Sequence, residues 1–363
     1  MTAHVRPAAD RCPGLLRPHR AEDGLVIRLR IPGGQTTSRT LLALTTLAGT
    51  LQLTSRGNVQ LRGIEEADLP AATDRIRGLG LLPSPSHELV RNIVASPLTG
   101  VTPERPDVRP LVAQLDAAIC AEPELEGLPG RFLFAVDDGS ADVWSLAFDV
   151  GYRALDAERG LLAFGGGSDR RRAEMTGRVI SSSAAPAEMV RVAADFVRAR
   201  EGSERAWRIW ELTDFRTGQA RFPGIGGNPG GDVAPSLGAV AGAASVGVPL
   251  GFLTADQAAA VDEAASGGPV VVTPWRSLII PNAAATTEAL RHAGLITDSG
   301  SPWTKITACV GAPACAKSLI DTRKLAVQMA DRGPLPTRPL HISGCERRCG
   351  APVVDHDELV GNR

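Results

Sequence analysis

The stretch Cys309-Val-Gly-Ala-Pro-Ala-Cys315 and the later stretch Gly344-Cys345-Glu-Arg-Arg-Cys349 hold four of the six cysteines of the chain. Two closely spaced pairs of thiolates are a natural ligand set for a metal centre. The first pair is spaced more widely than the cysteines of a usual zinc site, which lie about two to four residues apart. The spacing therefore favours a four-iron cluster over zinc. Two disulfides, or four buried thiols, are the alternatives without a metal.

The segment between the two pairs, residues 316–330, is predicted to form a helix from its apolar periodicity. Its expected buried positions are Leu319, Ile320, Leu325, Ala326 and Met329. Cys315 would then lie at the first turn of this helix, where free amide groups and the helix dipole stabilise a thiolate. Glycines beside the cysteines would let backbone amides approach sulfur.

Composition limits the classes of function. The chain has 363 residues, enough for two or three domains, and a net charge of -1, which offers no basic surface for nucleic acid or anionic lipid. Residues 1–23 carry charges throughout and contain no apolar core, so they are neither a signal peptide nor a membrane span. We therefore expect a cytoplasmic protein that binds neither nucleic acid nor a membrane.

An internal duplication is indicated by two segments with the same order of elements. The first has a strand at 25–31, a helix begun by Ser38, a hairpin at 50–61 and a helix at 69–79. The second has a strand at 244–252, a helix at 255–265 capped by Thr254, a hairpin at 270–281 and a helix at 287–293. Thr54-Ser-Arg56 matches Thr273-Pro-Trp-Arg276 in this comparison. Two βαββα halves would thus form one pseudo-symmetric domain.

A different unit lies between the halves. We predict strands at 128–136 and 143–148, a helix through Leu111 and Leu115, and an amphipathic helix at 188–200. Trp207 and Trp210 are expected to pack in the core. The glycine runs at 165–167 and 224–231 are expected to be loops. Residues 303–363 repeat the order of residues 91–148 in shortened form, so the layout is half, insert, half, insert.

The cysteine motif and this layout resemble the nitrite and sulfite reductase haemoprotein family. The resemblance implies that Cys309, Cys315, Cys345 and Cys349 hold a [4Fe-4S] cluster, with Cys349 also bridging to the iron of a sirohaem. It implies an α+β fold with duplicated ferredoxin-like half-domains and paired sirohaem and iron–sulfur domains. The strand expected after the last cysteine would be short or missing, because the sequence stops at Arg363.

The implied domain boundaries follow the same layout. They are an N-terminal lead-in at 1–24, a first ferredoxin-like half-domain at 25–86, a first sirohaem-type domain at 87–240, a second ferredoxin-like half-domain at 241–300 and a cluster-binding domain at 301–363.

Binding a polycarboxylate macrocycle requires cations, and arginine pairs carboxylates in a bidentate manner. The family places its macrocycle-binding residues in motifs that match Thr54-Ser-Arg56, Arg91-Asn92 and Leu128-Pro-Gly-Arg131 here. The resemblance therefore implies Arg56, Arg91, Asn92 and Arg131 as tetrapyrrole-binding residues. A solvated surface charge is the alternative for any single arginine. No catalytic residue is identified.

The third motif departs from the anion reductases. Those enzymes have two lysines there, one residue apart, whereas this chain has Arg131 and Leu133. An arginine does not readily give up a proton, which weakens the case for reduction of a small anion. Together with Cys12-Pro-Gly and Thr-Pro-Trp-Arg276, this departure resembles a branch of the family that hydroxylates precorrin-3A with O2. That resemblance implies precorrin-3A and O2 as substrates, and reduced nicotinamide or a reductase as the electron source.

Three questions stay open at the level of sequence. A second, mononuclear non-haem iron would need ligands, for which His341 and His356 are the nearby candidates. No nicotinamide-binding glycine loop is evident, so electrons are expected to come through a partner. A sirohaem-dependent nitrite or sulfite reductase, and a non-catalytic iron–sulfur tetrapyrrole-binding protein, are the alternative functions.

Overall fold

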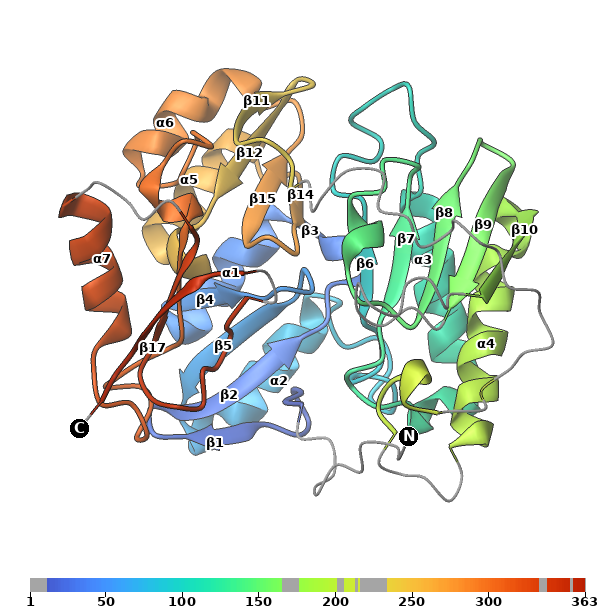
Figure 1. The fold of residues 1–363 in the computed structure, drawn as a ribbon, viewed down its shortest axis with the longest axis horizontal. Helices are drawn as coiled ribbons and strands as arrows, with labels where there is room; N and C mark the ends of the chain where they lie inside the picture. The colour runs from blue at the N-terminus through green and yellow to red at the C-terminus, as the bar shows by residue number, and fades with distance from the viewer. Residues whose placement is uncertain are drawn as a thin grey trace.

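The computed structural model describes residues 12–164, 176–200, 206–212, 215, 234–332, 338–352 and 355–362. It is a mixed α+β fold with four sheets, three of five strands and one of three strands, among these residues. Figure 1 shows the two central sheets beside each other, with the insert at one end of the molecule and the helix at 322–332 at the other. The glycine runs at 165–167 and 224–231, predicted as loops, lie outside the described residues.

The first half-domain is built on the sheet β1-β2-β5-β4-β13. Its own elements are β1 (His19–Ala21), β2 (Gly24–Leu29), α1 (Ser38–Ala48), β4 (Thr50–Leu53), β5 (Val59–Ile64) and α2 (Leu69–Gly78). Leu25, Ile27 and Leu29 are buried and the predicted strand is present, although Val26 on the opposite face is buried as well.

The second half-domain repeats this order on the sheet β11-β12-β15-β14-β3. Its own elements are β11 (Gly238–Val240), β12 (Ala243–Gly247), α5 (Ala255–Ala265), β14 (Pro269–Val272), β15 (Ser277–Ile280) and α6 (Thr287–His292). Apolar side chains of both halves form one continuous core, which joins Leu41 and Leu51 of the first to Val261 and Val272 of the second.

The halves exchange one short strand each. β3 (Gln35–Thr37) belongs to the first half by sequence but pairs with β14, and β13 (Phe252–Thr254) belongs to the second but pairs with β4. A glycine is required just before β3, because a Cβ on Gly34 would lie 1.9 Å from the Val272 carbonyl oxygen. The exchange makes each sheet depend on both halves.

Equivalent threonines begin the first helix of each half. Thr254 forms a capping box with Gln257 at the start of α5, as predicted. In the first half the cap is Thr37, whose side chain accepts a hydrogen bond from the Thr40 amide. The prediction that Ser38 caps this helix is therefore wrong by one residue. Ser38 instead donates to Asp262 at 2.8 Å and joins α1 to α5.

The insert is a sheet in the order β10-β9-β8-β7-β6. Its elements are β6 (Ile93–Ala95), α3 (Arg109–Ala121), β7 (Phe134–Asp137), β8 (Val150–Ala154), β9 (Arg159–Phe164), β10 (Thr176–Ser181) and α4 (Ala185–Ala199). Strands β6, β7 and β8 are parallel, and α3 and α4 pack on one face of the sheet. The predicted strand at 143–148 is wrong, because Val143–Ser145 is a short 3-10 helix that places Trp144 against the other face.

A buried carboxyl at the end of β7 predicts a pH-dependent stability. Burial, followed by the neighbouring Asp142, raises the pKa of Asp137 to about 7. One Asp137 oxygen accepts from the Gly139 and Ala141 amides, and the other has no hydrogen-bond partner among the described residues. The folded protein thus binds a proton that the unfolded chain releases near pH 4.

This stabilisation is complete below about pH 4 and is lost as the pH rises through about 7, because the folded pKa is raised. We expect the free energy of unfolding in urea to fall between pH 5 and pH 8, by at most about 4 kcal/mol from this group. Asp137→Asn should flatten this dependence and be the more stable protein at pH 8. An unchanged slope in the variant would contradict the assignment.

The cysteine-bearing unit is a parallel sheet in the order β16-β17-β18 with one helix. Its elements are β16 (Ile306–Ala308), α7 (Thr322–Arg332), β17 (Leu340–Ser343) and β18 (Asp357–Val360). The order strand, helix, strand, strand is the same as in β6, α3, β7 and β8. The strand predicted to be short or missing is thus present as the four residues of β18, which pair with β17.

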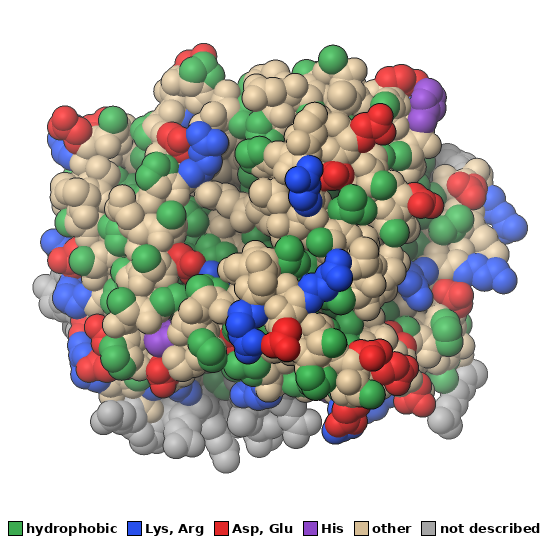
Figure 2. Space-filling view, turned by 180° about the vertical axis from the view of Figure 1, so that it is seen from behind, with side chains coloured by type: hydrophobic (Ala, Val, Ile, Leu, Met, Phe, Trp, Pro, Cys, Tyr) green, Lys and Arg blue, Asp and Glu red, His purple; other side chains and the backbone are tan. Residues whose placement is uncertain are grey.

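Charged side chains of both signs lie on the described surface (Figure 2). Figure 2 shows basic and acidic side chains interspersed across one face rather than gathered into a basic patch. Every helix among the described residues is too short or too polar to cross a bilayer.

Candidate functional site

The four motif cysteines come together at one edge of the β16-β17-β18 sheet. Cys309 directly follows β16, and Cys345 lies just beyond β17, which is the parallel neighbour of β16. The Cys309 amide donates to the Ile342 carbonyl at 3.0 Å, and the Gly344 amide donates to the Cys309 sulfur at 3.2 Å. Parallel strands therefore place the two loops side by side, and a backbone amide already points at one sulfur.

The chemistry of these four thiols allows them to hold a metal group. The four cysteines carry free thiols, so the structure does not pair them as disulfides. Burial raises the pKa of Cys349, and the three other cysteines raise it further, which places all four within electrostatic reach. Yet among the described residues no three His, Cys, Asp or Glu side chains are close enough to hold a single ion. Four thiolates on neighbouring loops are the donor set of an iron–sulfur cluster, which these residues could hold.

The loop after Cys315 differs from the prediction. Helix α7 begins at Thr322 rather than Ala316, so Cys315 does not lie at a helix N-terminus. Asp321 explains the later start, since its side chain accepts from the Lys324 amide at 3.0 Å in the manner of an N-cap. Leu319, predicted to be buried, is 46% exposed. Stabilisation of a Cys315 thiolate by a helix dipole is therefore excluded.

Three of the four predicted tetrapyrrole-binding residues meet at the loop before β7. Arg56, at the turn between β4 and β5, donates to the Arg131 carbonyl at 2.9 Å and to the Gly130 carbonyl at 3.4 Å. The Asn92 amide group donates to the Gly130 carbonyl at 3.1 Å and accepts from Asn58 at 3.2 Å. Burial lowers the pKa of Arg56 to about 9. Arg56 and Asn92 thus fix the backbone that carries Arg131.

Arg91 and Arg131 have contrasting surroundings. Arg91 is buried and forms a bidentate ion pair with Asp116 of α3, with both N–O distances 2.7 Å. The Arg131 side chain is exposed and stacks over Trp207, with 5.2 Å from its guanidinium carbon to the ring centroid. No ion pair is found for Arg131 among the described residues. Of these two arginines, Arg131 is the one with a guanidinium available to a ligand.

A buried ion pair supports the same loop and was missed by the sequence analysis. Arg208 lies 3.1 Å from Asp149 and donates to the Arg131 carbonyl at 3.0 Å. Asp149 is fully buried and also accepts from the Leu133 and Ile209 amides, both at 2.8 Å. The alternation of arginine and tryptophan in Trp207-Arg-Ile-Trp210 was the available signal.

The two tryptophans beside this ion pair do not pack in the core, contrary to the prediction. Both are partly exposed, and the guanidinium of Arg208 lies 4.1 Å from the ring centroid of Trp210. Arg131 over Trp207 is thus a stacked arginine at the surface of the insert, whereas Arg208 is buried. Leu133, by contrast, is buried against Trp144 and Phe148, so it cannot take the place of a second cation.

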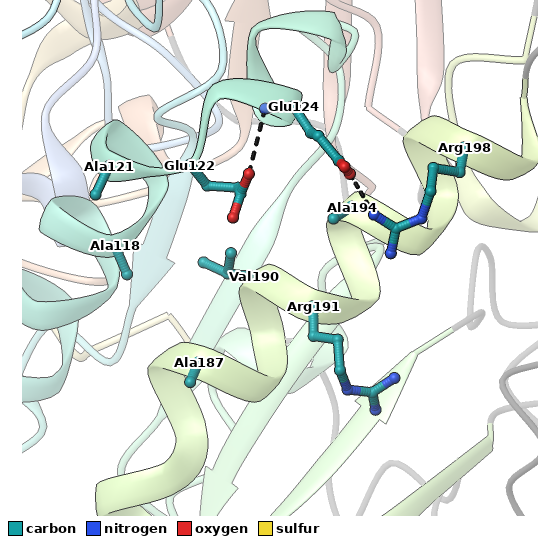
Figure 3. Close-up of a pocket in the computed structure, with 9 residues that line it drawn as sticks. All are labelled: Ala118, Ala121, Glu122, Glu124, Ala187, Val190, Arg191, Ala194 and Arg198. Carbon is teal, nitrogen blue, oxygen red and sulfur yellow. Dashed lines mark hydrogen bonds and ion pairs between the residues drawn. The ribbon is translucent and has the colours of Figure 1, made fainter.

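A groove between α3 and α4 is a separate feature of the insert. Figure 3 shows small apolar side chains on its floor, with Glu124 and Arg198 joined in an ion pair at its rim. Arg191 is paired with Glu188 and Asp195. Because these charges already have partners, the groove offers no chemistry of its own.

The comparisons with known proteins agree with this geometry. Residues 17–79 match the family model of the nitrite/sulfite reductase ferredoxin-like half domain. The Mycobacterium tuberculosis NirA structure aligns with 88% of this chain and 68% of its own, with a TM-score of 0.65 and 20% identity. The chain therefore has the nitrite/sulfite reductase fold, as the sequence predicted.

Two individual relatives show which members of this family the chain is similar to. Precorrin-3B synthase from Sinorhizobium sp is 24% identical, over 96% of this chain and 80% of that protein. Ferredoxin–nitrite reductase from Synechococcus elongatus is 28% identical, over 92% of this chain and 75% of that protein. These matches confirm the resemblance to the nitrite and sulfite reductase family and are consistent with its precorrin-3B synthase branch. Both relatives are oxidoreductases, which supports the same broad class for this chain.

Proposed function

We propose that this chain is a precorrin-3B synthase, which hydroxylates precorrin-3A at C20 with formation of a γ-lactone in aerobic cobalamin biosynthesis. The observation that carries the proposal is the loop before β7. It offers one exposed guanidinium, Arg131, and buries Leu133 where an anion reductase would need a second cation. The similarity to the Sinorhizobium precorrin-3B synthase over 96% of the chain supports it.

The reaction adds one oxygen atom of O2 to the macrocycle. The other atom leaves as water after taking up two electrons and two protons. Reduced nicotinamide supplies both electrons and one proton, directly or through a partner reductase, and solvent supplies the second proton. Cys309, Cys315, Cys345 and Cys349 would hold a [4Fe-4S] cluster, which when bound supplies single electrons. The amide of Gly344 would stabilise negative charge on the Cys309 sulfur through its hydrogen bond.

The side chains of the insert would orient the substrate. Arg131 would pair with a carboxylate of the macrocycle, since its fork is free of ion pairs among the described residues. Arg56 and Asn92 would act by holding the Gly130–Arg131 backbone, and Arg91 through its ion pair with Asp116. Such positioning decides which carbon of the ring is oxidised.

The candidate ligands of a mononuclear iron do not form a complete set. His341 is buried and its Nδ1 lies 2.9 Å from the Thr307 hydroxyl, and the His356 ring is 6.1 Å away. No third metal-ligating side chain joins them within the described part of the chain. We therefore assign no iron to these histidines and derive no step from one.

The proposal is tested on protein purified without oxygen. We expect about four irons with matching sulfide, no sirohaem, and conversion of precorrin-3A with uptake of one O2 when a reductant is present. One sirohaem per chain with nitrite or sulfite reduction would instead establish the alternative reductase. Binding of precorrin-3A without O2 uptake would make the protein a non-catalytic carrier.

A further inference from the structure

The hairpin turns of the two halves have the same hydrogen bonds, which fixes their equivalence residue by residue. In the first turn the Thr54 amide donates to the Asn58 carbonyl at 2.9 Å, and the Gly57 amide donates to the Thr54 carbonyl at 3.2 Å. In the second turn the Thr273 amide donates to the Ser277 carbonyl at 2.9 Å, and the Arg276 amide donates to the Thr273 carbonyl at 3.2 Å. Arg276 is thus the counterpart of Gly57, and the predicted match of Arg276 to Arg56 is wrong by one residue.

This position requires a left-handed backbone in both halves. The φ angle is 65° at Gly57 and 58° at Arg276. Glycine adopts this conformation without strain, whereas an arginine there clashes with its own backbone. A strained residue persists only where the surrounding structure enforces it, and such residues gather at functional sites. The second half therefore keeps an arginine where glycine would fold more easily.

The surroundings of Arg276 leave its charge without a partner. Its side chain is partly buried, and burial lowers its pKa. The buried or partly buried Arg56, Arg91 and Arg208 bind carbonyls or carboxylates. For Arg276, no side-chain hydrogen bond or ion pair is found among the described residues. A guanidinium without a partner in the protein is available to pair with a carboxylate.

The turn lies where three units of the fold face one another. Trp275 packs against the core of the insert that contains Trp144 and Phe148. Leu250, next to Gly251 in the second half-domain, packs against the core of the cysteine-bearing unit. Gly251 leaves space for the Arg276 side chain, because a Cβ on Gly251 would lie 2.9 Å from Cδ of Arg276. A ligand held among these units would meet this guanidinium.

We propose that Arg276 binds a carboxylate of the tetrapyrrole that lies between the second half-domain, the insert and the cysteine-bearing unit. The inference deepens the proposed function, because precorrin-3A is a polycarboxylate. It adds a second cation to Arg131 from a different unit of the fold. Two arginines on separate units would fix the orientation of the macrocycle, and the strain at Arg276 is maintained for binding rather than for folding.

Uroporphyrin III, a stable tetrapyrrole polycarboxylate, is the probe, and its dissociation constant from the full chain is measured by absorbance titration. Arg276→Gln should bind about tenfold more weakly with an unchanged melting temperature, because one charge-assisted pair is lost. Arg276→Gly should bind as weakly but melt at an equal or higher temperature, because the strain is relieved. Arg276→Lys should recover part of the affinity.

Arg291→Gln is the matched control, since Arg291 is exposed on α6 and paired with Glu288. It should bind like the unaltered protein, which separates a specific contact from a general change in charge. Equal affinity of Arg276→Gln and the unaltered protein would overturn the inference while leaving the proposed function standing. Failure of the unaltered protein to bind any tetrapyrrole would overturn both.

Discussion

Replacing Cys349 by serine is expected to abolish assembly of the iron–sulfur centre. A serine hydroxyl does not ionise at neutral pH and is a poor ligand for iron, so one corner of the cluster would have no attachment. Iron and acid-labile sulfide, measured after anaerobic reconstitution, should fall from about four to less than about one per chain. The broad visible absorption of the cluster should disappear with them.

Cys120 provides the matched control for this loss. It lies on α3 of the insert, outside the cysteine-bearing unit, and burial raises the pKa of its thiol, so it is a poor metal ligand. Cys120→Ser should therefore retain the iron and the absorption of the unaltered protein. Full iron content in Cys349→Ser would show that the fourth ligand has been assigned incorrectly.

The parts of the fold that could be predicted depend on local sequence. The helix at 255–265 was predicted to the residue because its cap and its periodicity are contained in the segment itself. The exchange of β3 and β13 between the halves could not be predicted, since strand pairing between distant segments leaves no local signal. The predicted match of the two hairpin turns was wrong for a related reason. It paired Arg56 with Arg276, whereas the hydrogen bonds of Thr54 and Thr273 define the equivalent positions.

The candidate site also combines residues that local sequence predicts with residues that it does not. The cysteine spacing predicted a shared metal site because short-range spacing is itself the signal, and the four thiols do gather at one sheet edge. The tryptophans beside Arg208 were a weaker signal and Asp149 gave none, because a single charge in a sequence does not reveal whether it is buried or paired. Arg276 is a candidate because its backbone is left-handed and its side chain has no partner among the described residues. Neither property can be deduced from the sequence.

Removing the Asp149 side chain is expected to destabilise the insert severely. Asp149→Ala leaves the Arg208 guanidinium buried without its carboxylate and deprives the Leu133 and Ile209 amides of their acceptor. Breaking one partner of a buried ion pair costs about 3–5 kcal/mol. We expect a loss of this size in the free energy of unfolding in urea. Asp195→Ala, on the surface of α4 with exposed partners, is the control and should lose at most about 1 kcal/mol.

The double variant Asp149→Leu with Arg208→Met separates an unpaired charge from a general loss of packing. If the cost of Asp149→Ala comes mainly from the stranded guanidinium, removing both charges should destabilise the protein less than Asp149→Ala alone. The stabilised double variant should nevertheless bind the tetrapyrrole probe more weakly, because Arg208 also donates to the Arg131 carbonyl and helps to fix that loop. A cost for Asp149→Ala no larger than that of Asp195→Ala would contradict the role of this ion pair. Recovery of stability without recovery of binding would show that the fold retains these buried charges to position Arg131 and not to hold the insert together.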